Sequence, residues 1–166
     1  MAEALEAFRM KPKLKWPNDV WLGGKKVAGI LVTSRVGIDD LVVVVGIGIN
    51  VTGDRANLPS GASSISASTG AVPELAELLA VLVARLDAGY TTFLGSSGDP
   101  DLSGWTSRAA LLGDLVEIQE GPATHRGVFI GVDRDGALLL QIRDGTVRRI
   151  IAGDLARGPH SPRESG

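Results

Sequence analysis

The sequence predicts an α+β protein in which a mixed or antiparallel sheet with flanking helices is followed by a small β-barrel. Three observations support this prediction: β-branched apolar runs in the first part, one long segment with apolar residues at helical spacing, and short strands separated by Asp-Gly turns near the end. With 166 residues, 44% of them hydrophobic and 22% charged, the chain is long and apolar enough to form a folded core.

The first part of the chain is predicted to hold a short helix and an antiparallel meander. Leu5 and Phe8 give Ala2–Met10 an apolar side, and Pro12 ends this helix. Strands are expected at Lys13–Trp16, Lys26–Arg35 and Leu41–Val51. The last of these, LVVVVGIGINV, is β-branched almost throughout, which predicts a strand buried on both faces.

The middle of the chain is predicted to be a loop followed by two helices. Ala56–Thr69 is rich in Ser and Thr and reads as a loop, within which Ser63–Ser66 could reach into the structure. From Glu74 to Leu94, leucines recur on one helical face, and Pro73 suits the first helical position. A second, shorter helix is expected at Asp101–Ala110.

The end of the chain is predicted to be a separate β domain. Asp135-Gly136 and Asp144-Gly145 are hairpin turn signals. The strands they separate are expected at Asp114–Gln119, Thr124–Asp133, Ala137–Ile142 and Val147–Ile151. We therefore expect a first domain at residues 1–110, a small β domain at 111–156, and a frayed tail at 157–166.

Composition excludes several classes of protein. A net charge of −2 argues against a nucleic-acid partner, and the lack of Cys excludes disulfides, thiolate zinc sites and cysteine nucleophiles. With 2 His, a histidine-rich metal site is not expected. The longest strongly apolar run, Leu41–Val51, is far shorter than the ~20 residues of a membrane helix. No signal peptide fits the first ten residues, so we expect a cytoplasmic protein with no membrane partner.

Three segments combine charged or amide side chains with glycine: KWPND at 15–19, KVAGILV at 26–32 and VGIGINV at 45–51. A lysine beside a buried strand needs an anionic partner, and glycine within a strand is typical of close approach by a ligand or another backbone. These segments predict a pocket for a small molecule carrying a phosphate or carboxylate. The alternative is a turn cation, a turn Asn-Asp pair and packing glycines. Neither a dinucleotide loop nor a P-loop fits, because the third glycine and the Ser/Thr after the lysine are missing.

In order and spacing, the three segments closely resemble the catalytic domain of biotin protein ligases, the biotin–[acetyl-CoA-carboxylase] ligases. Residues 113–155 resemble the SH3-like C-terminal domain of that family. The resemblance implies a class II synthetase-like ligase fold followed by an SH3-like barrel. It also implies a two-step reaction, in which the carboxylate of biotin attacks ATP to give biotinyl-AMP, and a lysine of a biotin carboxyl carrier protein then takes the biotinyl group.

The resemblance assigns roles to the polar residues of these segments. Lys26 matches the family's catalytic lysine, which contacts both the biotin carboxylate and the phosphate. Asn18 and Asn50 match amides near the phosphates and near the Mg²⁺ that accompanies ATP, although no protein ligand is assigned to the metal itself. Asp19 matches the carboxylate beside them, an orienter of a lysine or of the metal shell.

The glycines match positions where the backbone lines the substrates. Gly29 and Gly46 correspond to the biotin pocket, and Gly48 lets the chain pass close to the nucleotide. The complete set of residues expected to bind biotin or its adenylate is Lys15, Trp16, Asn18, Asp19, Lys26, Gly29, Gly46, Gly48 and Asn50.

The sequence also departs from the family. The ligases carry an upstream G-R-G-R-x-G loop over the adenylate and upstream biotin-binding Ser/Thr and Gln residues, whereas the nearest fragment here is Arg126-Gly127. We therefore expect the first half of the catalytic domain and any DNA-binding domain to be missing. The chain alone would be weak or inactive, and its uncovered sheet at Val42–Val45 and Ile47 could associate, for example as a homodimer. The alternatives are a non-catalytic relative that binds biotin, nucleotide or a partner, and an interaction module built on the SH3-like domain.

Overall fold

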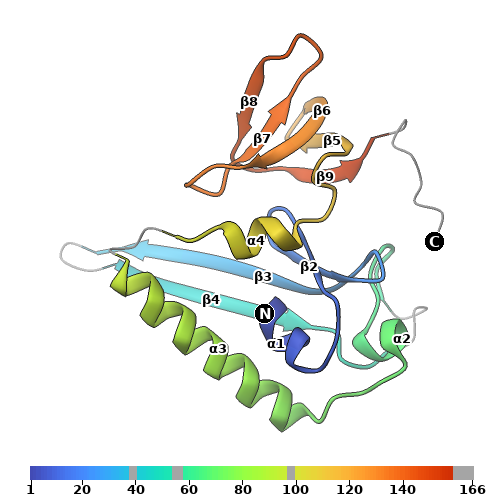
Figure 1. Ribbon diagram of the computed structural model, residues 1–166, viewed down its shortest axis with the longest axis vertical. Helices are drawn as coiled ribbons and strands as arrows, with labels where there is room; N and C mark the ends of the chain where they lie inside the picture. The colour runs from blue at the N-terminus through green and yellow to red at the C-terminus, as the bar shows by residue number, and fades with distance from the viewer. Residues whose placement is uncertain (38–40, 54–57, 97–99, 159–166) are drawn as a thin grey trace. The chain divides into compact units, whose positions relative to one another are not determined.

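The computed structural model describes residues 1–37, 41–53, 58–96 and 100–158. The chain divides into two compact units, one of residues 1–14 and 18–91 and the other of residues 15–17 and 92–166. Each unit has its own sheet and hydrophobic core (Figure 1). The α+β class is therefore confirmed, while domain boundaries at 110/111 and 156/157 stay predictions.

The first unit contains a four-stranded sheet with the strand order β1-β2-β3-β4. Its strands are β1 (Lys13–Lys15), β2 (Asp19–Leu22), β3 (Lys25–Val36) and β4 (Leu41–Ile49). Strands β2 and β3 are antiparallel and meet at Gly23 and Gly24, whose φ values of +55° and +73° favour glycine. Strand β2 was not expected from the sequence, because it begins within the polar Asn18-Asp19 pair directly after Pro17.

The core of the first unit lies on one side of strands β2 and β3. In β2, Val20 and Leu22 are buried while Asp19 and Trp21 are partly exposed, which is the two-residue period of a half-buried strand. Helix α1 (Ala2–Ala7) contributes the fully buried Leu5. The buried residues of this core are Leu5, Val20, Leu22, Val27, Ala28, Ile65 and Leu78.

Strand β4 corrects the expectation of a strand buried on both faces. The side chains of Leu41–Val45 are 50% to 63% exposed, and β4 is the edge strand of its sheet. Among the described residues it pairs only with β3, so its β-branched composition predicts the strand but not its burial. The lack of cover expected over Val42–Val45 is present, whereas Ile47 is half-buried.

Two helices follow the sheet in the chain, α2 (Ile65–Thr69) and α3 (Leu75–Gly95). Helix α3 matches the predicted segment, but only Leu78 and Leu82 are buried. By length and composition α3 could cross a membrane, since an 18-residue window within it has a mean hydropathy of 1.3. The core helices of soluble proteins pass the same test, so this single helix is weak support for a membrane span.

The second unit contains helix α4 (Ser103–Arg108) and a five-stranded sheet with the order β8-β7-β6-β5-β9. Its antiparallel strands are β5 (Leu115–Glu120), β6 (Ala123–Val132), β7 (Leu138–Gln141), β8 (Val147–Ile150) and β9 (Asp154–Arg157). The four predicted strands are confirmed, and β9 is additional. The backbone N–H of Gly158 donates to the carbonyl of Leu115, so pairing continues past Arg157, while residues 159–166 of the expected tail lie outside the described residues.

The core of the second unit is formed by inward-facing residues of its strands together with Trp16. Phe129 is fully buried, and the ring of Trp105 packs edge-on against it at a centroid distance of 6.5 Å. The buried residues are Trp16, Ala109, Val116, Ile118, Phe129, Leu138, Leu140, Ile150 and Leu155.

Aspartates fix the two predicted hairpin turns of the second unit. A carboxylate oxygen of Asp133 accepts the backbone N–H groups of Asp135 and Ala137 at 2.9 and 3.0 Å. Asp144 accepts the N–H of Thr146 at 2.8 Å in the same way. Gly136 and Gly145 follow with φ values of +79° and +87°, which explains the Asp-Gly pairs.

Candidate functional site

One row of residues crosses the sheet of the first unit and brings together three predicted site positions. In the antiparallel register, Asp19 of β2 lies opposite Gly29 of β3, and Gly29 lies opposite Gly48 of β4. Directly paired residues share a face of the sheet. The side chain of Asp19 therefore points to the side on which Gly29 and Gly48 expose bare backbone.

Lys26 is held over this row by an ion pair. Its Nζ lies 2.6 Å from Oδ1 of Asp19. The two side chains are 45% and 14% exposed, so the ammonium group remains accessible to solvent while the carboxylate is largely covered. The pair joins the start of β3 to the start of β2, and it brings the cation and carboxylate predicted from the sequence into direct contact.

Gly29 gives the Lys26 side chain its room. A Cβ placed at Gly29 would lie 3.2 Å from both Cε and Nζ of Lys26 and 3.7 Å from the Asp19 carboxylate. That approach is tighter than ordinary van der Waals contact, so any larger residue would displace the lysine. Gly29, which the resemblance assigns to the biotin pocket, is thus closely approached by the lysine of the same site.

Gly46 and Gly48 leave an open face on strand β4. A Cβ at Gly48 would meet nothing within 4 Å, and one at Gly46 would meet only the carbonyl of Leu31 at 3.6 Å. No packing in the described part of the chain therefore requires glycine at these two positions. Bare, uncovered backbone within an otherwise valine-rich strand is typical of a surface that a ligand approaches closely.

Asn50 and a serine-rich segment border the same region. The backbone N–H of Asn50 donates to the carbonyl of Val27 at 2.8 Å, and its Nδ2 donates to the carbonyl of Ser63 at 3.1 Å. The N–H of Ser63 donates in turn to the carbonyl of Lys26 at 2.8 Å. Ser63 is buried, so the expectation that this segment reaches into the structure is met. Sequence reasoning assigned it no part in the site, although a Ser-rich run between apolar elements was the available signal.

Lys15 and Trp16 belong to the second unit instead. Trp16 is 3% exposed in the core of that unit, and its Nε1 donates to the carbonyl of Gly136 at 3.0 Å. Nζ of Lys15 lies 2.9 Å from the Asp154 carboxylate. These contacts give both residues structural partners, and their expected binding roles stay predictions. Asn18 is exposed, and its carbonyl accepts the N–H of Ile30 at 2.9 Å.

Comparisons with known proteins agree with this arrangement. Residues 2–50, which include the row and the lysine, match the Biotin/lipoate A/B protein ligase family, and residues 112–157 match the Biotin protein ligase C terminal domain. A biotin protein ligase of Aquifex aeolicus, solved in complex with biotin and ATP, superposes with a TM-score of 0.78 at 29% identity. The superposition covers 95% of this chain and 67% of the Aquifex chain. Both segments of the chain are therefore similar to biotin protein ligases.

Two curated relatives show how much of a ligase is represented. The biotin--[acetyl-CoA-carboxylase] ligase of Paracoccus denitrificans is 39% identical over 137 residues, which are 77% of this chain and 56% of the relative. The bifunctional ligase/repressor BirA of Escherichia coli is 32% identical over 162 residues, which are 94% of this chain and 50% of BirA. The chain thus spans about half the length of the curated relatives it matches.

Proposed function

We propose that Lys26 and three glycines of strands β3 and β4 form the site at which biotin is activated by ATP. These glycines, Gly29, Gly46 and Gly48, are called the glycine row below. We propose further that the chain acts as a biotin protein ligase. The observation that supports this proposal is the accessible Lys26 ammonium, held by Asp19 above the exposed backbone of Gly29 and Gly48. A cation beside bare backbone suits two anionic substrates that must approach each other closely. The name of the superposed Aquifex structure, a complex with biotin and ATP, supports the same substrates.

The first step would join biotin to AMP. An oxygen of the biotin carboxylate attacks the α-phosphorus of ATP, the bond to pyrophosphate breaks, and biotinyl-AMP forms. Negative charge accumulates around phosphorus in this step, whereas the nucleophile is already ionised and needs no general base. The ammonium of Lys26 would bring the carboxylate and the phosphate together and stabilise the charge between them.

Asp19 would act as a positioning residue for Lys26. A lysine side chain has several rotatable bonds, so an isolated ammonium loses much conformational freedom when it is fixed on a substrate. The ion pair to Asp19 fixes it in advance at 2.6 Å, while 45% of the lysine side chain stays exposed. An anion can therefore bind the same ammonium group without any rearrangement of the sheet.

Mg²⁺ would enter with ATP. Magnesium is commonly held by substrate phosphates, a few waters and one or two protein oxygens. The described residues contain no group of three or more His, Cys, Asp or Glu side chains that could hold a metal ion. Asn50, whose Nδ2 is fixed on Ser63, keeps its amide oxygen for that ion or for a phosphate-bound water. Asn18, at the start of β2, is the second amide we assign there.

The second step would transfer the biotinyl group. The amine of a lysine on a biotin carboxyl carrier protein attacks the acyl carbon of biotinyl-AMP, AMP leaves, and an amide remains. The carrier protein is thus the proposed partner, and the cytoplasm is the proposed location. We also propose that copies of the chain associate through the uncovered strand β4. The sequence holds no G-R-G-R-x-G loop to cover the adenylate. We therefore expect these 166 residues alone to activate biotin more slowly than a chain that has such a loop.

A chimera tests the proposal independently of that rate. The aligned 77% of this chain replaces the matching stretch of the Paracoccus denitrificans ligase. Biotin-dependent exchange of labelled pyrophosphate into ATP is then measured. We expect exchange in the chimera, with a loss of at least about 100-fold in Lys26→Ala, as for loss of one charge-stabilising group. Lys25→Ala is the matched control, because neighbouring strand residues point to opposite faces. Undiminished exchange in Lys26→Ala would disprove the assignment, and biotin binding without exchange in the parent chimera would favour a non-catalytic relative.

A further inference from the structure

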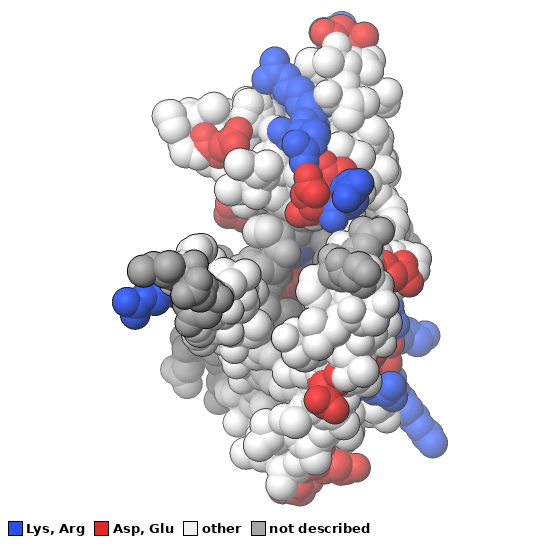
Figure 2. All heavy atoms as spheres, turned by 90° about the vertical axis from the view of Figure 1, so that its left-hand side faces the viewer, with Lys and Arg blue, Asp and Glu red and all other residues white. Residues whose placement is uncertain are grey.

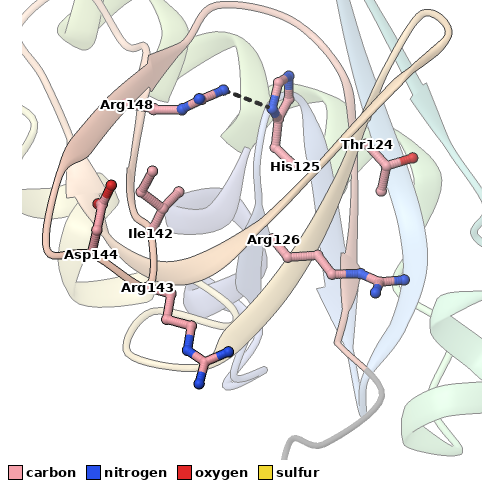
Figure 3. A pocket seen from close by; sticks show the side chains of 7 residues that line it. All are labelled: Thr124, His125, Arg126, Ile142, Arg143, Asp144 and Arg148. Atoms are coloured by element: carbon pink, nitrogen blue, oxygen red, sulfur yellow. Dashed lines mark hydrogen bonds between the residues drawn. The ribbon is translucent and has the colours of Figure 1, made fainter.

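The second unit contains a hollow that the proposed ligase site does not use. Its volume is about 460 Å³, within the range of small-molecule sites, and strand β6 and the β7–β8 turn form its walls (Figure 3). Four nitrogen-rich side chains line it, together with Thr124, Ile142 and Asp144. The nitrogen-rich side chains are those of His125, Arg126, Arg143 and Arg148.

Two of the three arginines are not neutralised by a carboxylate. Within the described parts of the chain, neither Arg143 nor Arg148 has an Asp or Glu oxygen within 4.0 Å. Arg126 differs, since its Nε lies 2.7 Å from Glu117. The hollow therefore presents two guanidinium groups whose hydrogen-bond donors remain available to a ligand.

The single carboxylate of the lining does not cancel these charges. Asp144 is engaged in its turn, where it accepts the backbone N–H of Thr146 at 2.8 Å. Hydrogen bonds from Thr146 hold the pKa of Asp144 below its ordinary value, and the charge of Arg148 contributes to that shift. The carboxylate is thus an ionised turn residue, and no hydrogen bond or close ion pair ties it to either free arginine.

His125 orients Arg148 toward the hollow. Nη1 of Arg148 lies 3.5 Å from Nδ1 of His125, and Nε2 of the same ring lies 3.0 Å from a carboxylate oxygen of Glu120. A guanidinium group can only donate, so Nδ1 is the acceptor and Nε2 donates its proton to Glu120. This Glu120–His125–Arg148 chain uses one donor of Arg148 and leaves the others for a ligand. Figure 3 shows the contact between Arg148 and His125.

The neighbouring arginine on the same strand shows that this arrangement is specific to one face. Arg149 follows Arg148 on β8 and points to the opposite side, where it pairs with the carboxylates of Asp133 and Asp135. Figure 2 shows Lys and Arg atoms lying beside Asp and Glu atoms in the upper part of that view. Arg149 is thus paired with carboxylates on that side, whereas Arg143 and Arg148 in the hollow are not paired with any carboxylate of the described residues.

We propose that the Arg143–Arg148 hollow binds a small ligand with two or more linked phosphoryl groups. Guanidinium groups bind phosphate oxygens through paired N–H donors, and two such groups suit a ligand that offers oxygens at two centres. The hollow is large enough for a diphosphate and adjoins half-buried Ile142, which offers apolar contact to whatever group carries the phosphates. The site lies wholly within the second unit and does not depend on Lys26.

The test is a titration of the full chain with inorganic pyrophosphate, followed by NMR of backbone amides and arginine Nε–H groups. We expect saturable shifts at Thr124–Arg126, Arg143 and Arg148. The double variant Arg143→Gln/Arg148→Gln should lose affinity by about tenfold or more, as expected for removal of charged hydrogen bonds. A second double variant, Arg85→Gln/Arg134→Gln, removes the same charge at exposed positions elsewhere and should bind like the parent chain.

Three results would overturn the proposal. Equal loss in both double variants would mean attraction by net charge alone. Shifts confined to the surroundings of Lys26, and absent in Lys26→Ala, would mean that only the ligase site binds pyrophosphate. Saturable binding of a glutamate-rich peptide without binding of pyrophosphate would make the hollow a protein-docking site instead. Far-UV circular dichroism of every variant confirms that each retains its fold.

Discussion

At the scale of single residues, the candidate site rests on the geometry of one lysine. Lys26 is placed by three neighbours: Asp19 binds its ammonium group, Gly29 leaves the space beneath it, and the backbone N–H of Ser63 donates to the carbonyl of Lys26. The contacts with Asp19 and Gly29 can be changed without removing a core side chain. Substitutions here therefore separate the position of the lysine from the stability of the sheet.

Gly29→Ala should move the lysine and leave the fold intact. The new Cβ would press on the flexible end of Lys26 at 3.2 Å, and the lysine can swing away at little cost. We expect the melting temperature to change little, while pyrophosphate exchange in the chimera falls by about tenfold, as for a misplaced catalytic group. Lys25→Ala is the control again, because its side chain lies on the opposite face of the strand from Lys26. If Gly29→Ala exchanged at the parent rate, Gly29 would not be needed for the position of Lys26.

Asp19→Asn should likewise change the position of Lys26 while leaving the fold stable. Because the lysine is 45% exposed, the pair contributes little to folding, and we expect a loss below about 1 kcal/mol in urea denaturation. The freed lysine should lower kcat of exchange more than it raises KM for ATP, since its position matters most in the transition state. A rise in KM alone would show that Asp19 serves binding and not the position of Lys26.

At the scale of elements, the hairpin turns of the second unit depend on ionised aspartates. The hydrogen bond from Arg149 is the main reason that the pKa of Asp133 lies below its ordinary 3.8, and backbone N–H groups of the turn add to the shift. A carboxyl whose pKa is lowered by folding stabilises the fold above its unfolded pKa, and that stabilisation disappears as the pH falls through the folded pKa. The β6–β7 hairpin should therefore weaken in acid below about pH 4.

The measurement is the urea midpoint of unfolding between pH 7 and pH 2, followed by near-UV circular dichroism. Asp133→Asn should lower the midpoint at pH 7 and flatten its fall toward pH 2, because the group that titrates is gone. Asp87→Asn on exposed helix α3 provides the control and should follow the parent curve. A parent-like pH dependence in Asp133→Asn would contradict this account of the hairpin.

The core of the second unit should be sensitive to truncation of its central ring. Phe129 is fully buried among strand residues and contacts Trp105, so Phe129→Ala should cost about 3–5 kcal/mol. Ile151 is 75% exposed just after β8, and Ile151→Ala should change stability by less than about 0.5 kcal/mol. Equilibrium urea denaturation compares the two. Equal losses would mean that the buried cluster is not the stabilising core.

Patterns within the sequence predict most of these elements, and the exceptions have physical causes. Strands β5 to β8 and helix α3 follow from two-residue and helical periodicity combined with Asp-Gly turns. Strand β2 does not, since four residues starting at Asp19 carry too little alternation after Pro17. Strand β9 adds to the sheet through long-range pairing with β5, which local residues do not encode.

The candidate site also combines residues that could be selected from the sequence with an arrangement that only the structure shows. Lys26, Asp19, Gly46 and Gly48 could be selected from residue chemistry and spacing, because charges and glycines within an apolar strand are conspicuous. Gly29 was assigned by the family resemblance alone. The opposition of Asp19, Gly29 and Gly48 required the register, which includes an irregularity between Val20 and Trp21. The packing of Trp16 in the second unit required the tertiary structure, because its contact with Gly136 joins residues 120 positions apart.

At the scale of the whole molecule, the exposed apolar strand β4 should govern association. Leu41–Val45 present five large apolar side chains on an edge strand whose outer backbone groups are unpaired within the described chain. We expect the sedimentation coefficient of the chain to rise with concentration. Val43→Lys/Val45→Lys should suppress the rise, since edge charges oppose strand pairing. A parent chain that stays monomeric at all concentrations would show that β4 does not drive association.

The whole chain spans about half the length of its curated relatives. The proposed ligase site is therefore best tested first through binding. Binding at the glycine row is the more direct property, because it depends on residues that the structure describes. The most direct test of the central claim is therefore where an adenylate binds.

That test is an NMR titration of the isotope-labelled chain with a non-hydrolysable analogue of biotinyl-AMP. We predict saturable shifts of the backbone amides of Gly29, Gly46 and Gly48, together with the Nζ resonance of Lys26, and loss of saturation in Lys26→Ala. Lys25→Ala should retain the parent shifts. Shifts located away from this row, or saturation that survives unchanged in Lys26→Ala, would contradict the claim that Lys26 and the glycine row form the adenylate site.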